Sequence, residues 1–282
     1  MSLRNRLDRG WRMFGTGLSF ACFGLGGVLL SLTLFPLIRL TSPDRDTTRR
    51  RIQRAMHYTF RLFVLQMTLL GVISYEVRGR ERLRRGGTLV VANHPSLIDV
   101  VLLIALMPEA DCIVKQALWR NPFLRWPVAW ADYTPNSDSA EQLVETAAAK
   151  LRAGRSLIIF PEGTRSRPGQ PLTMQRGAAR IALAAGTEVL PVTITCEPRM
   201  LGKGEPWYRV PPRPGHWRMV VGEPMHAADY APAGVPEPLA ARRLTRHFVE
   251  YFTRSVTAVT PAAAGGGSAL VPGGTMYRGV DA

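Results

Sequence analysis

The residues of this sequence best suited to chemistry are His94 and Asp99, in the run Asn-His-Pro-Ser-Leu-Ile-Asp that follows the apolar residues 88–92. A carboxylate bonded to one ring nitrogen of a histidine fixes the proton there and leaves the other nitrogen free as a base. The spacing does not suit one face of a helix, since five steps of ~100° leave the side chains ~140° apart. We therefore expect Pro95 to open the next helix and a turn at His94 to bend the imidazole back over the helix start.

A second run, Phe-Pro-Glu-Gly-Thr-Arg-Ser, follows the apolar residues 156–159 and is suited to binding an anion. The backbone amides of Gly163 and Thr164, the Thr164 hydroxyl and the Arg165 guanidinium form a set of donors that matches a phosphate. Arginine is particularly apt because it offers paired donors in a fixed fork. Glu162 has two interpretations: it bonds to a substrate hydroxyl, or it holds the loop in place.

From Val77 onward, short apolar stretches alternate with helical patterns, which predicts an α/β fold with a largely parallel central sheet flanked by helices. Strands are expected at residues 88–92, 112–114, 157–160, 189–195 and 218–221, and helices at residues 97–106, 140–152, 177–185 and 239–257. Ligands of such sheets bind outside the carboxyl ends of the strands. We therefore expect the two runs to form one pocket. Lys115 would be a third cation at the same edge, unless it is an ordinary solvated lysine.

Two apolar segments, residues 13–38 and 56–73, predict a membrane-associated helical hairpin before the α/β fold. The first segment carries no charge and, as a helix, is long enough to cross a ~30 Å hydrocarbon core. That length also disfavours a buried helix pair of a soluble core. Arginines crowd between the segments, so two spanning helices would place the richest cluster outside, against the positive-inside rule. Either a hairpin dipped into the cytoplasmic leaflet or one spanning segment remains.

We expect three parts: a membrane-associated segment at residues 1–75, a catalytic domain at residues 76–258, and a disordered tail at residues 259–282 that is rich in glycine, alanine and proline. The net charge of +15 points to an anionic partner. A membrane suits it better than nucleic acid, because the arginines crowd near the apolar segments and no basic stripe with interleaved aromatics is present.

The three cysteines, Cys22, Cys112 and Cys196, lie far apart along the chain. They show none of the close spacings that zinc sites and redox motifs require. We therefore expect neither a disulfide framework nor a metal site.

The two runs, in this order, resemble those of the glycerolipid acyltransferase family, typified by the lysophosphatidate acyltransferases. The similarity continues through residues 174–180 and 189–192 and covers roughly residues 77–224. It implies that His94 is a general base that deprotonates an acceptor hydroxyl and that Asp99 orients it. The resulting alkoxide attacks the thioester carbonyl of an acyl-CoA or acyl-carrier protein, with no cofactor and no metal.

The same resemblance implies that Lys115, Gly163, Thr164 and Arg165 hold the acceptor phosphate and that Glu162 belongs to this substrate-binding loop. The acceptor would be a lysophospholipid, 1-acylglycerol-3-phosphate, converted to phosphatidate at the cytoplasmic face of the inner membrane.

One departure from the family concerns the acceptor. Where relatives usually carry a strand that ends in Asp-Arg, this chain reads Asp132-Tyr133. The same chemistry on another lipid acceptor, of the ornithine or polyene type, therefore remains an alternative. A non-catalytic membrane adaptor is a further alternative from a different class, disfavoured by intact His94, Asp99 and Arg165.

Overall fold

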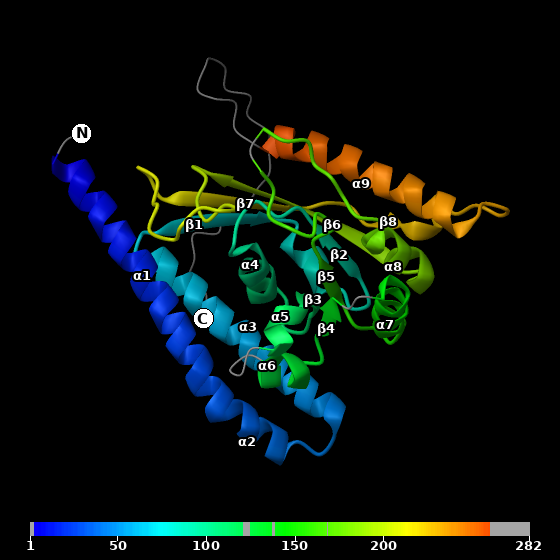
Figure 1. Ribbon diagram of the computed structural model, residues 1–282, viewed down its shortest axis with the longest axis horizontal. Helices are drawn as coiled ribbons and strands as arrows, with labels where there is room; N and C mark the ends of the chain where they lie inside the picture. Colours follow the sequence, from blue (N-terminus) through cyan, green and yellow to red (C-terminus); the bar gives the residue numbers. More distant parts are fainter. Residues whose placement is uncertain (1–2, 121–124, 137–138, 168, 260–282) are drawn as a thin grey trace.

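The computed structural model describes residues 3–120, 125–136, 139–167 and 169–259 (Figure 1). In this part of the chain eight strands form one sheet, in the order β1-β7-β6-β2-β5-β3-β4 with β8 beside β6. The strands are β1 (Ile73–Arg78), β2 (Leu89–Ala92), β3 (Asp111–Lys115), β4 (Thr134–Asn136), β5 (Leu157–Ile159), β6 (Glu188–Glu197), β7 (Gly215–Val221) and β8 (Met225–His226).

The sheet is largely parallel, as the sequence predicts. Parallel pairing runs without interruption from β6 through β2, β5 and β3 to β4, and β1 is parallel to β7. Only the pairs that β6 makes with β7 and β8 are antiparallel among the described strands. The carboxyl ends of β2, β5 and β3 therefore lie at one edge of the sheet.

Helices cover both faces of the sheet (Figure 1). One face carries α7 (Ala140–Arg152), α8 (Gly177–Ala185) and α9 (Glu237–Val259), and the other carries α3 (Arg45–Leu69) and α4 (Asp99–Leu106). The shorter helical elements are α5 (Gln116–Arg120), α6 (Arg125–Trp130), η1 (Arg80–Arg84) and η2 (Ala227–Tyr230). The result is a three-layered α/β structure.

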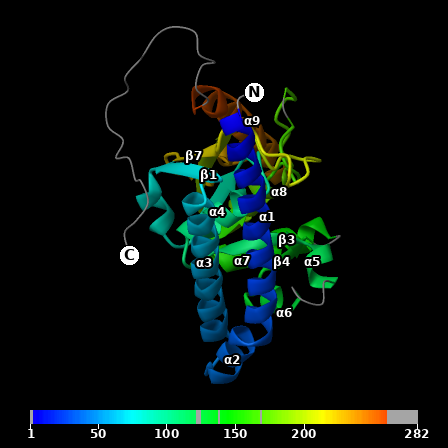
Figure 2. The same ribbon diagram turned by 90° about the vertical axis from the view of Figure 1, so that its left-hand side faces the viewer.

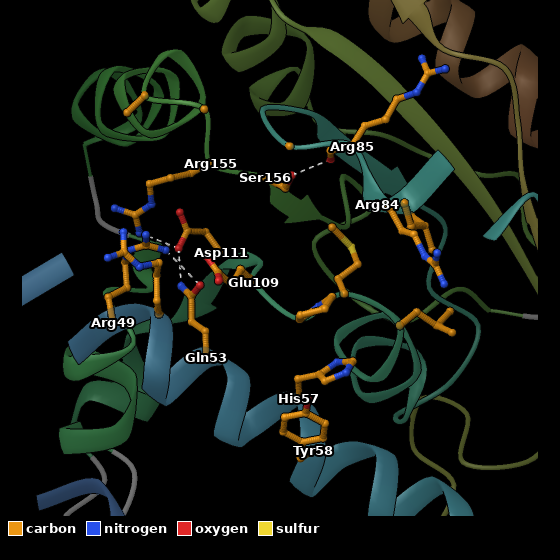
Figure 3. A pocket seen from close by; sticks show the side chains of 18 of the residues that line it. Arg49, Gln53, His57, Tyr58, Arg84, Arg85, Glu109, Asp111, Arg155 and Ser156 are labelled. Carbon is orange, nitrogen blue, oxygen red and sulfur yellow. Dashed lines mark hydrogen bonds and ion pairs between the residues drawn. The ribbon is translucent and has the colours of Figure 1, made fainter. Parts of the chain in front are cut away.

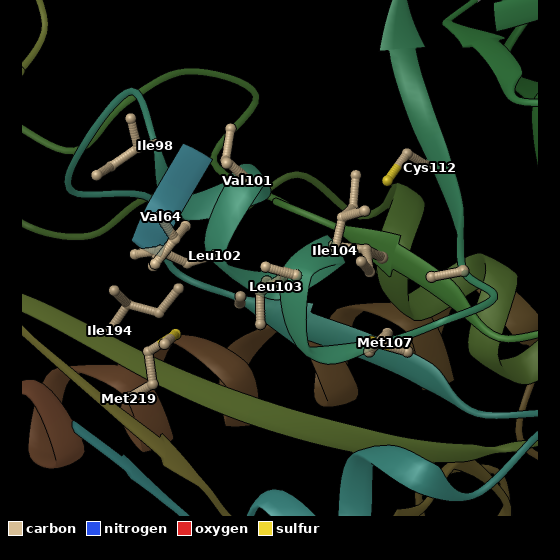
Figure 4. Packing of buried hydrophobic residues seen from close by; sticks show 14 of the residues in the cluster. Val64, Ile98, Val101, Leu102, Leu103, Ile104, Met107, Cys112, Ile194 and Met219 are labelled. Carbon is tan, nitrogen blue, oxygen red and sulfur yellow. The ribbon is translucent and has the colours of Figure 1, made fainter. Parts of the chain in front are cut away.

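Strand β2 shows how the sequence builds these layers. Its residues are buried on both faces, and successive side chains point to opposite sides. Leu89 and Val91 join the hydrophobic cluster under α7, α8 and α9, whereas Val90 and Ala92 join the cluster around α4. Helix α4 is buried almost all round, and Figure 4 shows its Leu102, Leu103 and Ile104 side chains within that second cluster. The strand that precedes His94 is therefore fixed from above and below.

The N-terminal residues form α1 (Leu3–Leu32), α2 (Leu34–Thr41) and α3, and α1 and α3 lie side by side (Figure 2). Aromatic rings join them, with the ring centroids of Phe23 and Phe63 4.7 Å apart. The break between α1 and α2 precedes Pro36, which cannot donate to the carbonyl four residues earlier and whose ring crowds it.

One candidate membrane-spanning helix is found in the described residues, Leu3–Thr41, with a mean hydropathy of 2.1 and 6% of its apolar window buried. The second apolar segment, residues 56–73, is not a candidate membrane-spanning helix by the same criteria of length and hydropathy. Its residues up to Leu69 belong to the longer α3, and its last residue, Ile73, begins β1. Phe63 and Met67 of α3 are buried in the cluster that contains α4. The pattern of residues 56–73 was thus partly that of a core-facing helix.

One further expectation is wrong. The first helix of the α/β part begins at Asp99, not near Pro95, because the Asp99 carboxylate accepts the Ser96 amide at 2.6 Å and holds the intervening residues as a turn. Strands β1 and β4 were not expected. Residues 260–282 of the expected tail lie outside the described residues.

Candidate active site

His94 projects from a loop that Asn93 anchors directly after β2. The Asn93 side chain donates to the Ile194 carbonyl at 2.8 Å and accepts the Ile194 amide at 2.7 Å. Asn93 is buried, so these two bonds replace the ladder that β2 no longer makes with β6. The backbone before His94 is thereby fixed against β6.

The imidazole of His94 contacts the carboxylate of Asp99, with Nδ1 and Oδ2 2.9 Å apart. An ionised carboxylate only accepts, so we assign the proton to Nδ1 and leave Nε2 as the basic nitrogen. The turn before α4, longer than the one expected at His94, brings the imidazole over the start of the helix despite the unfavourable helical spacing. His94 and Asp99 are thus arranged as a base and its orienting partner.

Asp99 is completely buried, and donors surround its carboxylate. Ser96 donates its hydroxyl to Oδ1 at 2.5 Å in addition to the amide bond already described. The indole Nε1 of Trp217, on β7, lies 3.1 Å from both Oδ1 of Asp99 and Oγ of Ser96. These bonds compensate the cost of burying the charge. Sequence reasoning did not identify Trp217 or Ser96.

The ring of Phe160 stacks on His94, with centroids 4.3 Å apart and planes at 29°. Phe160 directly follows β5, which is the parallel neighbour of β2. The first residue of the second run therefore packs against the proposed base.

Glu162 links the two runs. Its Oε1 accepts the backbone amide of His94 at 2.8 Å and the Ser166 hydroxyl at 2.8 Å, and the Ser166 amide donates to the His94 carbonyl at 2.7 Å. Burial raises the pKa of Glu162, although the bonds from His94 and Ser166 oppose this. The contacts match the interpretation in which Glu162 holds the loop.

Gly163 and Thr164 form the exposed tip of this loop. Gly163 has φ +67°, a conformation that favours glycine, and its amide donates to the Phe160 carbonyl at 3.0 Å. That amide is therefore engaged in the turn. The Thr164 amide and hydroxyl are the candidate anion donors that remain at this tip.

Arg165 follows Thr164 in the same loop after β5. Its Nη1 donates to the carbonyls of Leu201 at 3.0 Å and Gly202 at 2.8 Å. The Leu201 carbonyl also accepts the amide of Leu97 at 3.0 Å, so this one carbonyl joins the loops of both runs. Arg199, another residue that sequence reasoning missed, donates to the Ser166 carbonyl at 2.5 Å.

Lys115 is the last residue of β3, and its side chain is exposed. Strand β5 lies between β3 and β2, so Lys115 shares their carboxyl edge but is two strands away from His94. Among the described residues, no cluster of three or more His, Cys, Asp or Glu side chains forms a candidate metal site. The three cysteines are unpaired, and burial raises the pKa of Cys196 to about 12, so this thiol stays protonated.

Residues 74–195, which contain both runs, match the family model described as Acyltransferase. The chain is 28% identical over 172 residues to a 1-acyl-sn-glycerol-3-phosphate acyltransferase of Pseudomonas aeruginosa, an alignment covering 58% of this chain and 64% of that protein. It is 26% identical over 221 residues to the mouse 1-acyl-sn-glycerol-3-phosphate acyltransferase alpha, covering 76% of this chain and 75% of the mouse protein.

The crystal structure of the 1-acyl-sn-glycerophosphate (LPA) acyltransferase PlsC from Thermotoga maritima has the same fold. The TM-score is 0.66 at 22% sequence identity, over 93% of this chain and 99% of that chain. The chain spans less than two thirds of the length of some curated relatives, 64% for the P. aeruginosa protein and 55% for the chloroplastic LPAT1 of Arabidopsis thaliana. These matches confirm the resemblance carried by the two runs, which both lie within the residues that match the Acyltransferase family model.

Proposed function

We propose that this protein is a membrane-associated O-acyltransferase that moves a fatty acyl group from an acyl-CoA or acyl-carrier protein to the hydroxyl of a lysophospholipid. The acceptor is 1-acylglycerol-3-phosphate and the product is phosphatidate, the class of reaction for which the relatives are named. The observation that carries the proposal is the contact between His94 Nδ1 and the buried Asp99 carboxylate, at the carboxyl end of β2.

In this mechanism Nε2 of His94 takes the proton of the acceptor hydroxyl as its oxygen bonds to the thioester carbonyl carbon. Collapse of the tetrahedral intermediate breaks the carbon–sulfur bond. The imidazolium then returns its proton to the leaving thiolate, so the base is regenerated. Asp99 stabilises the transient imidazolium and keeps the ring oriented.

Arg165, Thr164 and Lys115 are proposed to bind the acceptor phosphate. Arg165 and Thr164 are carried by the loop that Glu162 ties to the backbone of His94. A phosphate bound there would lie near the base, and Lys115 would add a charge from the same edge of the sheet.

Helices α1 and α2 are proposed to hold the protein at the membrane, with the catalytic domain at the cytoplasmic face. Large apolar side chains are exposed along both helices, among them Leu25, Leu29 and Leu40. Arginines precede this apolar stretch and follow it, where anionic headgroups would attract them.

The alternative acceptor is favoured by one structural detail. Asp132, the aspartate of the altered family motif, pairs with Arg155 at 2.7 Å and with Lys150 at 3.3 Å. The next residue is the buried Tyr133, not an arginine. An acceptor of the ornithine or polyene type would not need the missing guanidinium.

The test is product analysis with the purified full-length protein in detergent. Palmitoyl-CoA is supplied with oleoyl-lysophosphatidate, or separately with a lyso-ornithine lipid, and products are identified by mass spectrometry. We expect phosphatidate that carries both chains. Acylation of the ornithine acceptor alone would assign the alternative, and release of CoA without any acylated lipid would contradict acyl transfer.

A further inference from the structure

A cavity of about 930 Å³ is lined by residues at the amino ends of β2, β3 and β5, among them Arg85, Asp111 and Ser156 (Figure 3). His94 follows the carboxyl end of β2, at the opposite edge of the sheet. The cavity walls come from α3, η1, the residues after α4, and the segment 153–156 before β5. Helix α4 begins beside His94 and ends at Leu106 in the cavity wall, ~12 Å further along its axis. The cavity is therefore distinct from the candidate active site. Its volume is typical of small-ligand sites.

Arginines dominate the cavity, and some of them are structural. Figure 3 shows Arg155, Asp111, Gln53 and Arg49 together on one side. Arg155 pairs with the buried Asp111 at 2.6 Å, and Gln53 donates to the same carboxylate at 2.8 Å. Arg49 pairs with Asp46 at 2.7 Å. These contacts neutralise two of the carboxylates in the wall.

The third carboxylate of the wall, Glu109, pairs with Arg54 at 2.6 Å. Every carboxylate that lines the cavity therefore has an arginine partner. Arg61, Arg80 and Arg84 also line it, and within the described residues none of them has a carboxylate within ion-pair distance. The wall thus holds an excess of positive charge.

His57 is a buried residue of the cavity wall, and its pKa is affected by the positive charge there. Its pKa is lowered chiefly by burial, and the charges of Arg61 and Arg80 lower it further. Its Nδ1 is engaged with the Ile104 carbonyl at 2.8 Å. Arg61 lies one turn after His57 on α3, and Arg80 begins η1, so guanidinium groups from two elements line the cavity. Such a lining suits a ligand with more than one anionic oxygen.

One side of the cavity opens onto an apolar surface. Tyr58 lines the cavity and is 64% exposed. It begins a stripe of exposed residues along α3, Tyr58, Leu62, Leu65 and Leu69, whose spacing places them on one helical face. A ligand with an anionic head and apolar chains would match the cavity and the stripe together.

We propose that this cavity binds the phosphate of an anionic membrane lipid, with the headgroup among Arg61, Arg80 and Arg84 and the chains along the α3 stripe. The phosphate is the chemistry that the arginines recognise, and the stripe selects a lipid source over a soluble one. This site is separate from acyl transfer and does not depend on it.

The experiment uses the full-length protein in nonionic detergent and isothermal titration calorimetry. The probes are dihexanoyl phosphatidylglycerol, dihexanoyl phosphatidylcholine and inorganic phosphate. Phosphatidylglycerol is neither the proposed acceptor nor the proposed product, so failure here is distinguishable from failure of the enzymatic proposal. The variant Arg61→Gln/Arg80→Gln removes two charges from the cavity. Arg242→Gln/Arg243→Gln removes two from exposed positions on α9 and serves as the matched control.

We expect phosphatidylglycerol to bind the wild type more tightly than either other probe. Its Kd should rise about tenfold or more in Arg61→Gln/Arg80→Gln, as the loss of charge-assisted bonds implies, and change less than about twofold in the α9 control. The variant Arg80→Gln/Arg84→Gln changes only residues of η1 and should show the same loss of affinity. It therefore tests the cavity charge without any substitution in α3. Equal affinity in the cavity variants and the wild type would overturn the proposal. Inorganic phosphate binding as tightly as phosphatidylglycerol would assign a soluble phosphate and contradict the lipid source.

Discussion

At the scale of single residues, several independent contacts fix the position of His94. Its ring is held by Asp99 and stacked by Phe160, and its backbone amide is held by Glu162. A base that is fixed in this way loses little entropy when it meets the acceptor hydroxyl. Asp99 begins α4, and Phe160 and Glu162 lie in the loop after β5, so the site depends on the packing of the sheet as well as on the two runs.

Trp217 is a positioning residue in this arrangement, because it touches Asp99 and not the substrates. Trp217→Phe removes the indole donor, and we expect kcat to fall about tenfold while the KM values for both substrates stay unchanged. Steady-state kinetics measures both parameters, with urea unfolding as a check on stability. Trp207→Phe, at an exposed tryptophan, is the control. A rise in KM at constant kcat would contradict the positioning role.

Arg165 and Lys115 are expected to bind the acceptor phosphate. Arg165→Ala and Lys115→Ala should each raise the KM for lysophosphatidate about tenfold or more, while the KM for acyl-CoA changes little, because a charge-assisted bond to one substrate is lost. A phosphate-free lysolipid serves as the comparison acceptor. Equal effects on the two acceptors would show that these residues do not bind phosphate.

The sequence was sufficient to predict the contact between His94 and Asp99, since the two residues are close in the chain. Trp217 lies 118 residues from Asp99 and reaches it only through the position of β7 in the sheet. No local pattern marks an indole that will be buried beside a carboxylate. The engagement of the Gly163 amide in a turn is likewise a property of backbone geometry, not of residue type.

At the scale of elements, the site is built on two adjacent parallel strands. Strands β2 and β5 pair from Leu89 and Leu157 onward, so the loops that follow them emerge side by side. Their apolar composition made both strands predictable. Strand β1 was missed because its half-buried residues continue directly from the apolar segment before it, and β4 because it has only three residues.

Asn93 fixes the end of β2 to β6, and its removal tests this element directly. Asn93→Ala leaves the Ile194 amide and carbonyl without partners in a buried place, so we expect a loss of about 2–4 kcal/mol in the free energy of unfolding. Urea denaturation of the full-length protein measures it. An unchanged midpoint would show that water or a shifted backbone satisfies Ile194.

At the scale of the whole molecule, the apolar N-terminal helices and the catalytic domain form one structure. Helix α3 packs against α4 in the same core cluster, while α1 packs on α3 and exposes its outer face. The sequence predicted two similar apolar segments. It could not show that the second would be partly buried, because residues 56–73 meet the same apolar criterion whether they face lipid or a protein core.

The exposed face of α1 is expected to hold the protein in the membrane. Leu25→Asp/Leu29→Asp places two carboxylates there at a cost of about 5 kcal/mol, which should move a large share of the protein into the soluble fraction. Fractionation by ultracentrifugation, with a high-salt wash, measures the distribution. Leu239→Asp, exposed on α9, is the control and should stay with the membrane. Release of the wild type by salt alone would mean that the arginines, not the apolar face, provide the binding.

The most direct test of the central claim is the rate of acyl transfer by His94→Ala. The purified variant and the wild type are compared at saturating palmitoyl-CoA and oleoyl-lysophosphatidate, after circular dichroism shows that both are folded. Loss of the general base is expected to lower kcat by about 10²–10⁴. A folded His94→Ala protein that forms phosphatidate at the wild-type rate would contradict the assignment of His94 as the base.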